Sequence, residues 1–211
     1  MNGAILLVRH GETEWNLQRR YQGRSDSPLT ENGIAQAHAI GTLASELPVS
    51  VIVASPLGRA RLTAELILEH LPLAVDLHLD DRLRELSLGC WDGLTYQEIA
   101  GREPGVFEGD GRFEWYFRSP DGEGYDAFAG RLADWLHEWS GCGALLVVTH
   151  GIVSRVLRGL YARLPRSVAL TLPVRQDRIY RLAGGLIKEL APEEPGRGET
   201  PRAAADKGRS R

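Results

Sequence analysis

The chain has 211 residues, of which 43% are hydrophobic, so it is long enough for one domain with a sizeable buried core and short for two. Its formal net charge of -3 argues against a nucleic-acid binder that works through a bulk positive field. No apolar stretch reaches the length of a membrane span or a secretory signal, and the two cysteines lack metal-type spacing. We therefore expect a soluble, cytoplasmic protein that binds neither nucleic acid nor membrane.

The first half of the chain alternates predicted strands with predicted helices. Residues 4–8 and 50–54 are apolar, β-branched runs typical of strands buried on both faces. A helix is predicted to begin near Thr30, where Pro28 and Thr30 give a start signal. A second helix is predicted over residues 56–70, with a proline close to its N-terminus.

The second half begins with an irregular segment and returns to the same alternation. Residues 101–128 are rich in glycine, aromatic and acidic residues without a clean period, which predicts a lid-like insertion over one face. Residues 144–149 predict a third buried strand, and residues 151–160 a helix that follows it directly.

The last predicted elements are strands. Residues 168–172, 178–182 and 186–190 all have strand-like composition, the last two being joined by a Gly-Gly hairpin turn. From residue 191 to residue 211 the chain lacks apolar periodicity, so we expect a disordered tail after a single domain at residues 1–190. Strands alternating with helices predict a three-layer α/β/α sandwich with a mostly parallel central sheet. The apolar late strands are a candidate edge for a homodimer.

Two strands end in the same pair of residues. The segments AILLVRHG and ALLVVTHG each lead from a buried strand into histidine and glycine, at His10-Gly11 and His150-Gly151. Ligands of parallel α/β sheets bind beyond the carboxyl ends of the strands, so both imidazoles are expected in one crevice. A single such histidine is more often a packed core residue, but the repetition favours a functional site.

Arginines near these histidines favour a phosphate ligand over a metal. Two imidazoles are compatible with zinc, but Arg9 adjoins one of them, and a guanidinium beside a metal ion is electrostatically unfavourable. The segment SPLGRARLTA places Arg59 in the first turn of the helix after the second strand, where an anion is also favoured. Arg9 and Arg59 are therefore a candidate phosphate clamp.

Four segments in this order resemble the histidine phosphatase (phosphoglycerate mutase-like) superfamily: LVRHGETEWN, SPLGRARLTA, LRELSLGCWDG and VVTHG. The resemblance spans roughly residues 5–160 and implies that His10 is the nucleophile that forms a phosphohistidine. It also implies that the phosphoryl group is bound without a metal or cofactor by a set of surrounding residues: Arg9, Asn16, Gln22, Gly23, Arg59, His150 and Gly151. An arginine-rich cradle of this kind stabilises the charge that develops during phosphoryl transfer.

Glu85 matches the position of the acid in this family. In LRELSLGCWDG it stands where the resemblance implies a carboxylic acid that protonates the leaving oxygen and later accepts a proton from water. On spacing alone, an exposed glutamate paired with Arg82 or Arg84 would be the commoner outcome. Asp92 and Leu88 stand where the family usually has Glu and Phe, and both are interpreted as structural.

Three functions are compatible with these residues. A phosphatase that acts on a small phosphomonoester is favoured over a phosphoglycerate mutase, because no lysine lies between Gly3 and Leu186 and residues 86–89 lack the basic run found in the mutases. The acidic residues of segment 101–128 are also expected to repel a second phosphate. A phospho-ligand binding module without turnover is the third alternative, but binding alone requires neither a nucleophile nor an acid.

The aromatic residues of segment 101–128 allow two interpretations. Some of them are hypothesised to line the leaving-group site and to favour phosphates with an apolar body. The alternative, at least as good, is that they bury the insertion against the domain. The set comprises Phe107, Phe113, Trp115, Tyr116, Phe117, Tyr125 and Phe128.

Overall fold

A single mixed sheet forms the centre of the molecule. The computed structural model describes residues 3–109 and 113–192, and within them six strands are arranged in the order β3-β2-β4-β1-β5-β6. The first four in this order pair in parallel, whereas β5 pairs antiparallel with β1 and β6 antiparallel with β5. The strands are β1 (Ile5–Arg9), β2 (Val51–Ala54), β3 (Asp76–Leu79), β4 (Leu145–Thr149), β5 (Ile179–Ala183) and β6 (Leu186–Leu190).

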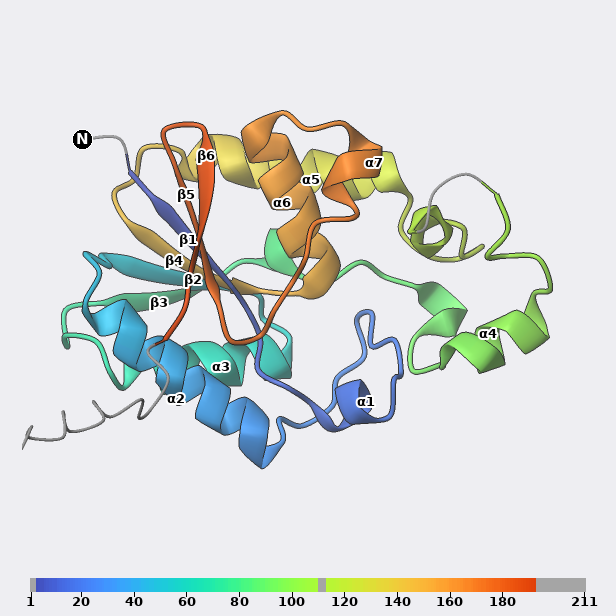
Figure 1. Ribbon diagram of the computed structural model, residues 1–211, viewed down its shortest axis with the longest axis horizontal. Coiled ribbons are helices and arrows are strands. Elements are labelled where there is room, and N and C mark those ends of the chain that lie inside the picture. Colours follow the sequence, from blue (N-terminus) through green and yellow to red (C-terminus); the bar gives the residue numbers. More distant parts are fainter. Residues whose placement is uncertain (1–2, 110–112, 193–211) are drawn as a thin grey trace, which may run out of the picture.

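Helices cover both faces of this sheet and complete the predicted α/β/α sandwich (Figure 1). One face packs against α2 and α3, and the other against α5 and α6. The α-helices are α1 (Glu14–Leu17), α2 (Glu31–Ser45), α3 (Gly58–Leu68), α4 (Tyr96–Arg102), α5 (Tyr125–Trp139), α6 (Gly151–Ala162) and α7 (Arg166–Ala169). None of the helices in the described part of the chain is both long and apolar enough to cross a membrane.

The alternation of side chains along β1 explains why two separate cores form. Leu6 and Val8 belong to the core beneath α2 and α3, whereas Ile5 and Leu7 belong to the core beneath α5 and α6. Successive side chains of a strand point to opposite faces, so a continuous apolar run fills both layers. Each aliphatic side chain of this kind contributes about 1.5–3 kcal/mol when fully buried.

Local signals set the starts of the helices that follow the strands. Thr30 caps α2, since its side chain accepts a hydrogen bond of 3.0 Å from the Gly33 amide. Helix α3 begins at Gly58, two residues after Pro56, and thereby places Arg59 in its first turn. Helix α6 begins directly after His150. These three predicted helices, the three buried strands and the β5–β6 hairpin are confirmed.

The predicted strand at residues 168–172 is wrong. The segment belongs instead to α7 and the turn after it, and Ala169 and Leu170 are its buried residues. Ala169 packs against Gly159 of α6, where an added Cβ would lie 2.4 Å from the Ala169 Cβ. A short apolar run fits either a strand or a buried helical turn, and the contact with α6 decided between them.

Strand β3 and the helices α1, α4 and α5 had not been predicted. Strand β3 is a short edge strand whose side chains are largely exposed, so it lacks the apolar run of a buried strand. Helix α5 begins inside the segment that had been interpreted as an irregular insertion, and its buried residues are Phe128, Leu132 and Trp135. From residue 193 on, the expected disordered tail lies outside the described residues.

Candidate active site

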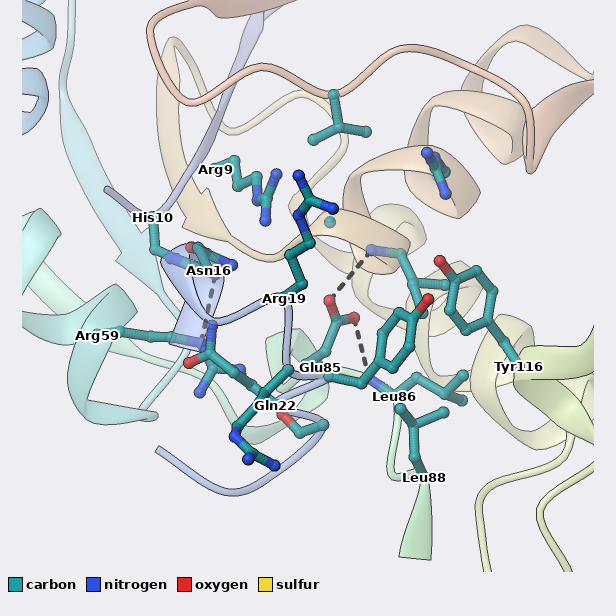
Figure 2. A pocket seen from close by; sticks show the side chains of 17 residues that line it. Arg9, His10, Asn16, Arg19, Gln22, Arg59, Glu85, Leu86, Leu88 and Tyr116 are labelled. Atoms are coloured by element: carbon teal, nitrogen blue, oxygen red, sulfur yellow. Dashed lines mark hydrogen bonds between the residues drawn. The ribbon is translucent and has the colours of Figure 1, made fainter. Parts of the chain in front are cut away.

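The two strand–His–Gly segments lie side by side, as expected. Strands β1 and β4 pair in parallel with Arg9 opposite Thr149, and the His10 amide donates a hydrogen bond of 2.9 Å to the Thr149 carbonyl. The imidazole rings of His10 and His150 are consequently 5.3 Å apart between centroids. His10 lines a pocket of about 300 Å³, at whose wall the side chains of Arg9, Arg59 and Glu85 also lie (Figure 2).

The neighbours of His10 decide which of its ring nitrogens carries the proton. Its Nδ1 lies 2.8 Å from the Gly11 carbonyl oxygen, which can only accept, so Nδ1 carries the proton of the neutral ring. The lone pair is then on Nε2, which accepts a hydrogen bond of 3.3 Å from Arg59 Nε. The neighbouring backbone therefore fixes the tautomer that a nucleophilic imidazole needs.

The protonated forms of both histidines are disfavoured. Burial lowers the pKa of His10 well below its ordinary value, and the nearby guanidinium groups of Arg59 and Arg9 lower it further. The pKa of His150 is lowered in the same direction, chiefly by burial and then by Arg59. A desolvated imidazole surrounded by cations stays neutral, and only the neutral form is nucleophilic.

The protein itself uses most of the N–H donors of Arg59, so too few remain for a bidentate grip on phosphate. Its Nη1 donates to the Ser25 carbonyl at 2.6 Å and to Asp26 Oδ1 at 3.0 Å, and its Nη2 donates to the Gly23 carbonyl at 2.9 Å. With Nε directed at His10, one of its five N–H donors is left for a ligand. Arg59 therefore holds the loop at residues 23–26 and faces His10, with one N–H remaining for a phosphate oxygen.

Arg9, in contrast to Arg59, keeps its N–H donors unpaired within the described residues. Its guanidinium makes no side-chain hydrogen bond to the described residues, and its Nε is buried without a partner. Burial lowers its pKa, whereas the Glu85 carboxylate opposes this shift. Figure 2 shows Arg9 beside the pocket, so its unpaired donors make it the better of the two arginines for a bidentate grip on phosphate.

His150 is fully buried and contacts a hydroxyl group. Its Nε2 lies 2.7 Å from Ser55 Oγ, at the end of β2, and its Nδ1 has no partner within the described residues. Since a serine hydroxyl both donates and accepts, this contact does not fix the tautomer. The sequence had indicated His150 but not its serine partner.

Glu85 is bound by the start of α6. Its Oε1 accepts hydrogen bonds from the amides of Leu86 at 3.0 Å and Val153 at 3.3 Å, and its Oε2 accepts one of 3.1 Å from the Ile152 amide. The Ile152 and Val153 amides belong to the first turn of α6, where carboxylates are favoured. Glu85 forms no ion pair with Arg82 or Arg84, which pair with Asp80, Glu138 and Asp81 instead. The structure thus places the carboxylate at the pocket wall.

The predicted loop ligands lie at the same pocket. Asn16 Oδ1 accepts from the Thr13 amide at 3.1 Å and from Gln176 Nε2 at 3.0 Å, which leaves its amide nitrogen unpartnered in the described structure. Gln22 Nε2 donates to Thr13 Oγ1 at 2.8 Å, and its Oε1 is buried without a partner. Nε2 carries a second N–H, which is left to donate to a phosphate oxygen.

Asp92 explains why the loop needs a glycine at position 23. Gly23 has φ of 52° and an added Cβ would lie 1.7 Å from Asp92 Oδ1. Asp92 accepts hydrogen bonds of 3.0 Å from the amides of Arg24 and Leu88. The aspartate thus joins the loop of residues 23–26 to the segment after Glu85, which agrees with the structural role predicted for it.

Several residues of the site had not been predicted. Gln176, in the loop before β5, donates to Asn16 and, at 3.3 Å, to the His10 carbonyl. Arg155 lines the pocket four residues after Gly151 on α6. Residues spaced by four share one face of a helix, so this arginine was accessible to sequence reasoning. Gln176 had no local signal. The remaining additions to the pocket wall are Arg19, Arg20, Tyr21, Leu86, Leu88, Ile152 and Val174.

The acidic residues of segment 101–128 that the structure describes do not line the pocket, so the expected repulsion of a second phosphate has no acid at the pocket wall to cause it. Glu103 accepts a hydrogen bond from Trp91 Nε1, Glu114 pairs with Arg166, and Glu123 pairs with Arg131. None of the acids of this segment that the structure describes lines the pocket, and Asp110 lies outside the described residues.

Of the seven aromatic residues predicted as candidates in that segment, Tyr116 lines the pocket. Phe107, Phe113 and Trp115 illustrate the others, which pack around the core beneath α5 and α6. The burial interpretation therefore holds for most of the set. The described residues include no cluster of three or more His, Cys, Asp or Glu side chains that could hold a metal ion.

Comparison with known proteins agrees with this geometry. The sequence matches the histidine phosphatase superfamily (branch 1) over residues 5–184. A relative from Shigella boydii, "Probable phosphoglycerate mutase GpmB", is 37% identical, with 89% of this chain and 91% of that protein covered. The structure of Bacillus stearothermophilus YhfR superposes with a TM-score of 0.76 at 30% identity, covering 90% of this chain and 96% of that one.

A mycobacterial glucosyl-3-phosphoglycerate phosphatase, Rv2419c, superposes with a TM-score of 0.73 at 26% identity, covering 90% of this chain and 97% of that one. The family match, the relative and these structures all extend over most of the chain, and the matched region includes His10, Arg59, Glu85 and His150. The chain therefore belongs to the histidine phosphatase superfamily.

Proposed function

We propose that this protein is a metal-independent phosphomonoester hydrolase that works through a phosphohistidine on His10. The observation that carries the proposal is the fixed tautomer of His10, whose Nε2 lone pair lies at the pocket between Arg9 and Arg59. A module that only binds phosphate needs no such lone pair, because an acceptor facing a phosphate oxygen is repulsive.

In the first half of the reaction, His10 Nε2 forms the N–P bond while the P–O ester bond breaks. The leaving oxygen takes a proton from Glu85. Arg9, His150 and the remaining donor of Arg59 stabilise the charge on the other phosphoryl oxygens, with Asn16 adding a hydrogen bond.

In the second half, the Glu85 carboxylate accepts a proton from water as the water oxygen attacks phosphorus. The P–N bond breaks, which releases inorganic phosphate and restores neutral His10. The arginines supply the positive charge in both steps, so the proposal involves no metal.

A phosphoglycerate mutase is the second candidate. The name of the Shigella relative and the number of arginines around the pocket favour it. Against it, Leu86 and Leu88 bring apolar side chains to the pocket wall immediately after the acid. The name of the mycobacterial phosphatase favours hydrolysis. The apolar wall leads us to prefer the hydrolase.

The test is release of inorganic phosphate from a panel of monophosphates in the presence of EDTA, with wild-type protein and the His10→Ala variant. Release by the wild type alone, together with a base-stable, acid-labile phosphoryl label on the protein, is the expected result. Interconversion of 3- and 2-phosphoglycerate without net phosphate release would favour the mutase instead. If the protein shows no phosphate release, no mutase activity and no phosphoryl label, both proposals are rejected.

A further inference from the structure

The candidate active site carries more positive charge than a single phosphate group needs. Five of the residues that line it are arginines, while Glu85 is the one acidic side chain among the described lining residues. Such an excess around a small pocket attracts anionic ligands. The arginines are Arg9, Arg19, Arg20, Arg59 and Arg155.

Two of these five charges are neutralised by the protein. Arg20 pairs with Glu98 at 2.9 Å, and Arg59 pairs with Asp26 at 3.0 Å. The other three arginines take part in no ion pair within residues 3–109 and 113–192. One of them, Arg9, adjoins the proposed nucleophile and is assigned to the phosphate that is transferred. Two unpaired arginines therefore remain after the first phosphate is bound.

Arg155 is the more informative of these two. It is partly buried, its Nε donates to the Leu172 carbonyl at 3.0 Å, and its guanidinium lies 4.3 Å from the centre of the Phe113 ring. These contacts fix the guanidinium at the pocket wall next to Tyr116. Burial raises the pKa of Tyr116, and the nearby Arg155 guanidinium opposes this rise. Within the described residues this fixed, partly buried cation has no carboxylate partner, which makes it a candidate binding group for an anion.

Arg19 lies on the loop after α1 and is exposed, so it needs no partner for stability. Its backbone nevertheless adopts φ of 56°, a left-handed conformation that is uncommon for residues other than glycine. Figure 2 shows its side chain among those that line the pocket. Its exposed side chain is therefore a second candidate to contact a bound anion.

We infer that the pocket holds a second anion subsite, formed by Arg155 and Tyr116 with Arg19 as a further contact, and that the substrate is a small phosphomonoester whose body carries a second anionic group. This inference rests on the proposed function for its use of His10 as the centre of reaction. A carboxylate and a second phosphate share the chemistry that these guanidinium groups recognise. The pocket volume of about 300 Å³ limits the body to a small molecule.

The test compares ligands that differ in the second charge alone. 3-Phosphoglycerate and glycerol 3-phosphate differ by a carboxylate against a hydroxymethyl group. Propane-1,3-diol bisphosphate and its monophosphate form the corresponding pair for a second phosphate. Dissociation constants from calorimetry and kcat/KM from phosphate release are measured for the wild type and for Arg155→Gln, Arg155→Lys and Arg19→Gln. Arg181→Gln, which removes an exposed arginine that does not line the pocket, is the matched control.

We expect the wild type to prefer the doubly anionic member of at least one pair by about tenfold or more, as a charged hydrogen bond implies. Arg155→Gln should bring the ratio close to one, Arg155→Lys should retain part of it, and Arg19→Gln should lower it less. Arg181→Gln should leave it unchanged. The pair with the larger preference identifies the second group as carboxylate or phosphate.

Equal affinity for both members of both pairs in the wild type would overturn the subsite. So would an Arg155→Gln variant that weakens both members equally, since Arg155 would then only support the loop at Leu172. The two proposals fail separately: a preserved binding preference without phosphate release would reject the hydrolase and retain the subsite. Phosphate release without any preference for the doubly anionic ligand would retain the hydrolase and reject the subsite.

Discussion

The two strand–His–Gly segments have nearly the same sequence and different chemistry. Their strands pair in parallel register, and both imidazoles are buried and held neutral by desolvation and neighbouring arginines. His10 donates through Nδ1 to the Gly11 carbonyl, which leaves the lone pair on Nε2. His150 contacts the Ser55 hydroxyl through Nε2 instead. The atom that each ring meets, rather than the motif, makes one histidine a candidate nucleophile and the other a supporting group.

The glycines that follow the two histidines also differ in their surroundings. A Cβ on Gly11 would lie 2.3 Å from the Gly33 carbonyl oxygen of α2, so close packing requires glycine there. A Cβ on Gly151 would lie 3.7 Å from Glu85 Oε2 and 3.8 Å from Arg9 Nε, an ordinary contact distance. Gly151 is therefore tolerant of a side chain for folding, but such a side chain would enter the pocket.

Replacement of the two histidines gives the largest expected contrast. His10→Ala should lower phosphate release by about 10⁴-fold or more, because the nucleophile itself is lost. His150→Ala should lower it by about 10²- to 10³-fold, the cost of one stabilising group. Trapping of a phosphoryl label should disappear in the first variant and persist in the second. A label retained by His10→Ala would reverse the assignment.

Glu85→Gln tests the proton donor that is bound by the helix following His150. The loss should be about 10²- to 10⁴-fold for an alkyl phosphate, whose leaving oxygen needs a proton. It should be much smaller for p-nitrophenyl phosphate, whose leaving group is stable without one. The two substrates are compared by initial rates, with folding checked by thermal unfolding. Equal losses for both would argue against a role in protonation.

The glycine contrast predicts a difference in stability. Gly11→Ala should lower the free energy of unfolding by about 1–3 kcal/mol, because the added methyl group meets the backbone of α2. Gly151→Ala should change it by about 0.5 kcal/mol or less while lowering activity. Urea unfolding measures the first effect and phosphate release the second. Similar destabilisation by both substitutions would show that the two glycines do not differ in how closely they are packed.

The smallest expected effect is a change in how stability depends on pH. The pKa of His10 is lowered in the folded protein, so below about pH 6.5 the unfolded chain binds one more proton at this residue than the folded protein does. Stability should therefore fall as the pH drops below that value. His10→Asn should reduce this slope by at most about 1.4 kcal/mol per pH unit.

Urea unfolding is measured for each protein at about pH 7 and about pH 5.5, which lie on either side of the ordinary histidine pKa. The difference in the free energy of unfolding between the two pH values gives one slope for the wild type and one for His10→Asn. The exposed His137 provides a matched substitution, His137→Asn, that should leave the slope unchanged. Identical slopes for the wild type and His10→Asn would show that His10 titrates normally in the folded protein.

The sequence by itself determined the three buried parallel strands, the helices that follow them and the placement of His10, Arg59, Glu85 and His150. Buried strands are continuous apolar runs, and helix starts are marked by neighbouring residues, so both signals are local. Shared motifs then indicated the family. The sequence was misleading at residues 168–172, where a short apolar run fits two conformations and packing against Gly159 favours the helix.

Only the tertiary structure decided which atoms meet in the site. The Ser55 partner of His150 is 95 residues away in the chain, and Gln176 is 160 residues from Asn16. It also left the described acids of segment 101–128 outside the pocket lining and brought Arg155 into it. Hydrogen bonds and ion pairs act over a few ångströms, and distant segments reach that range only when the sheet and its helices pack together.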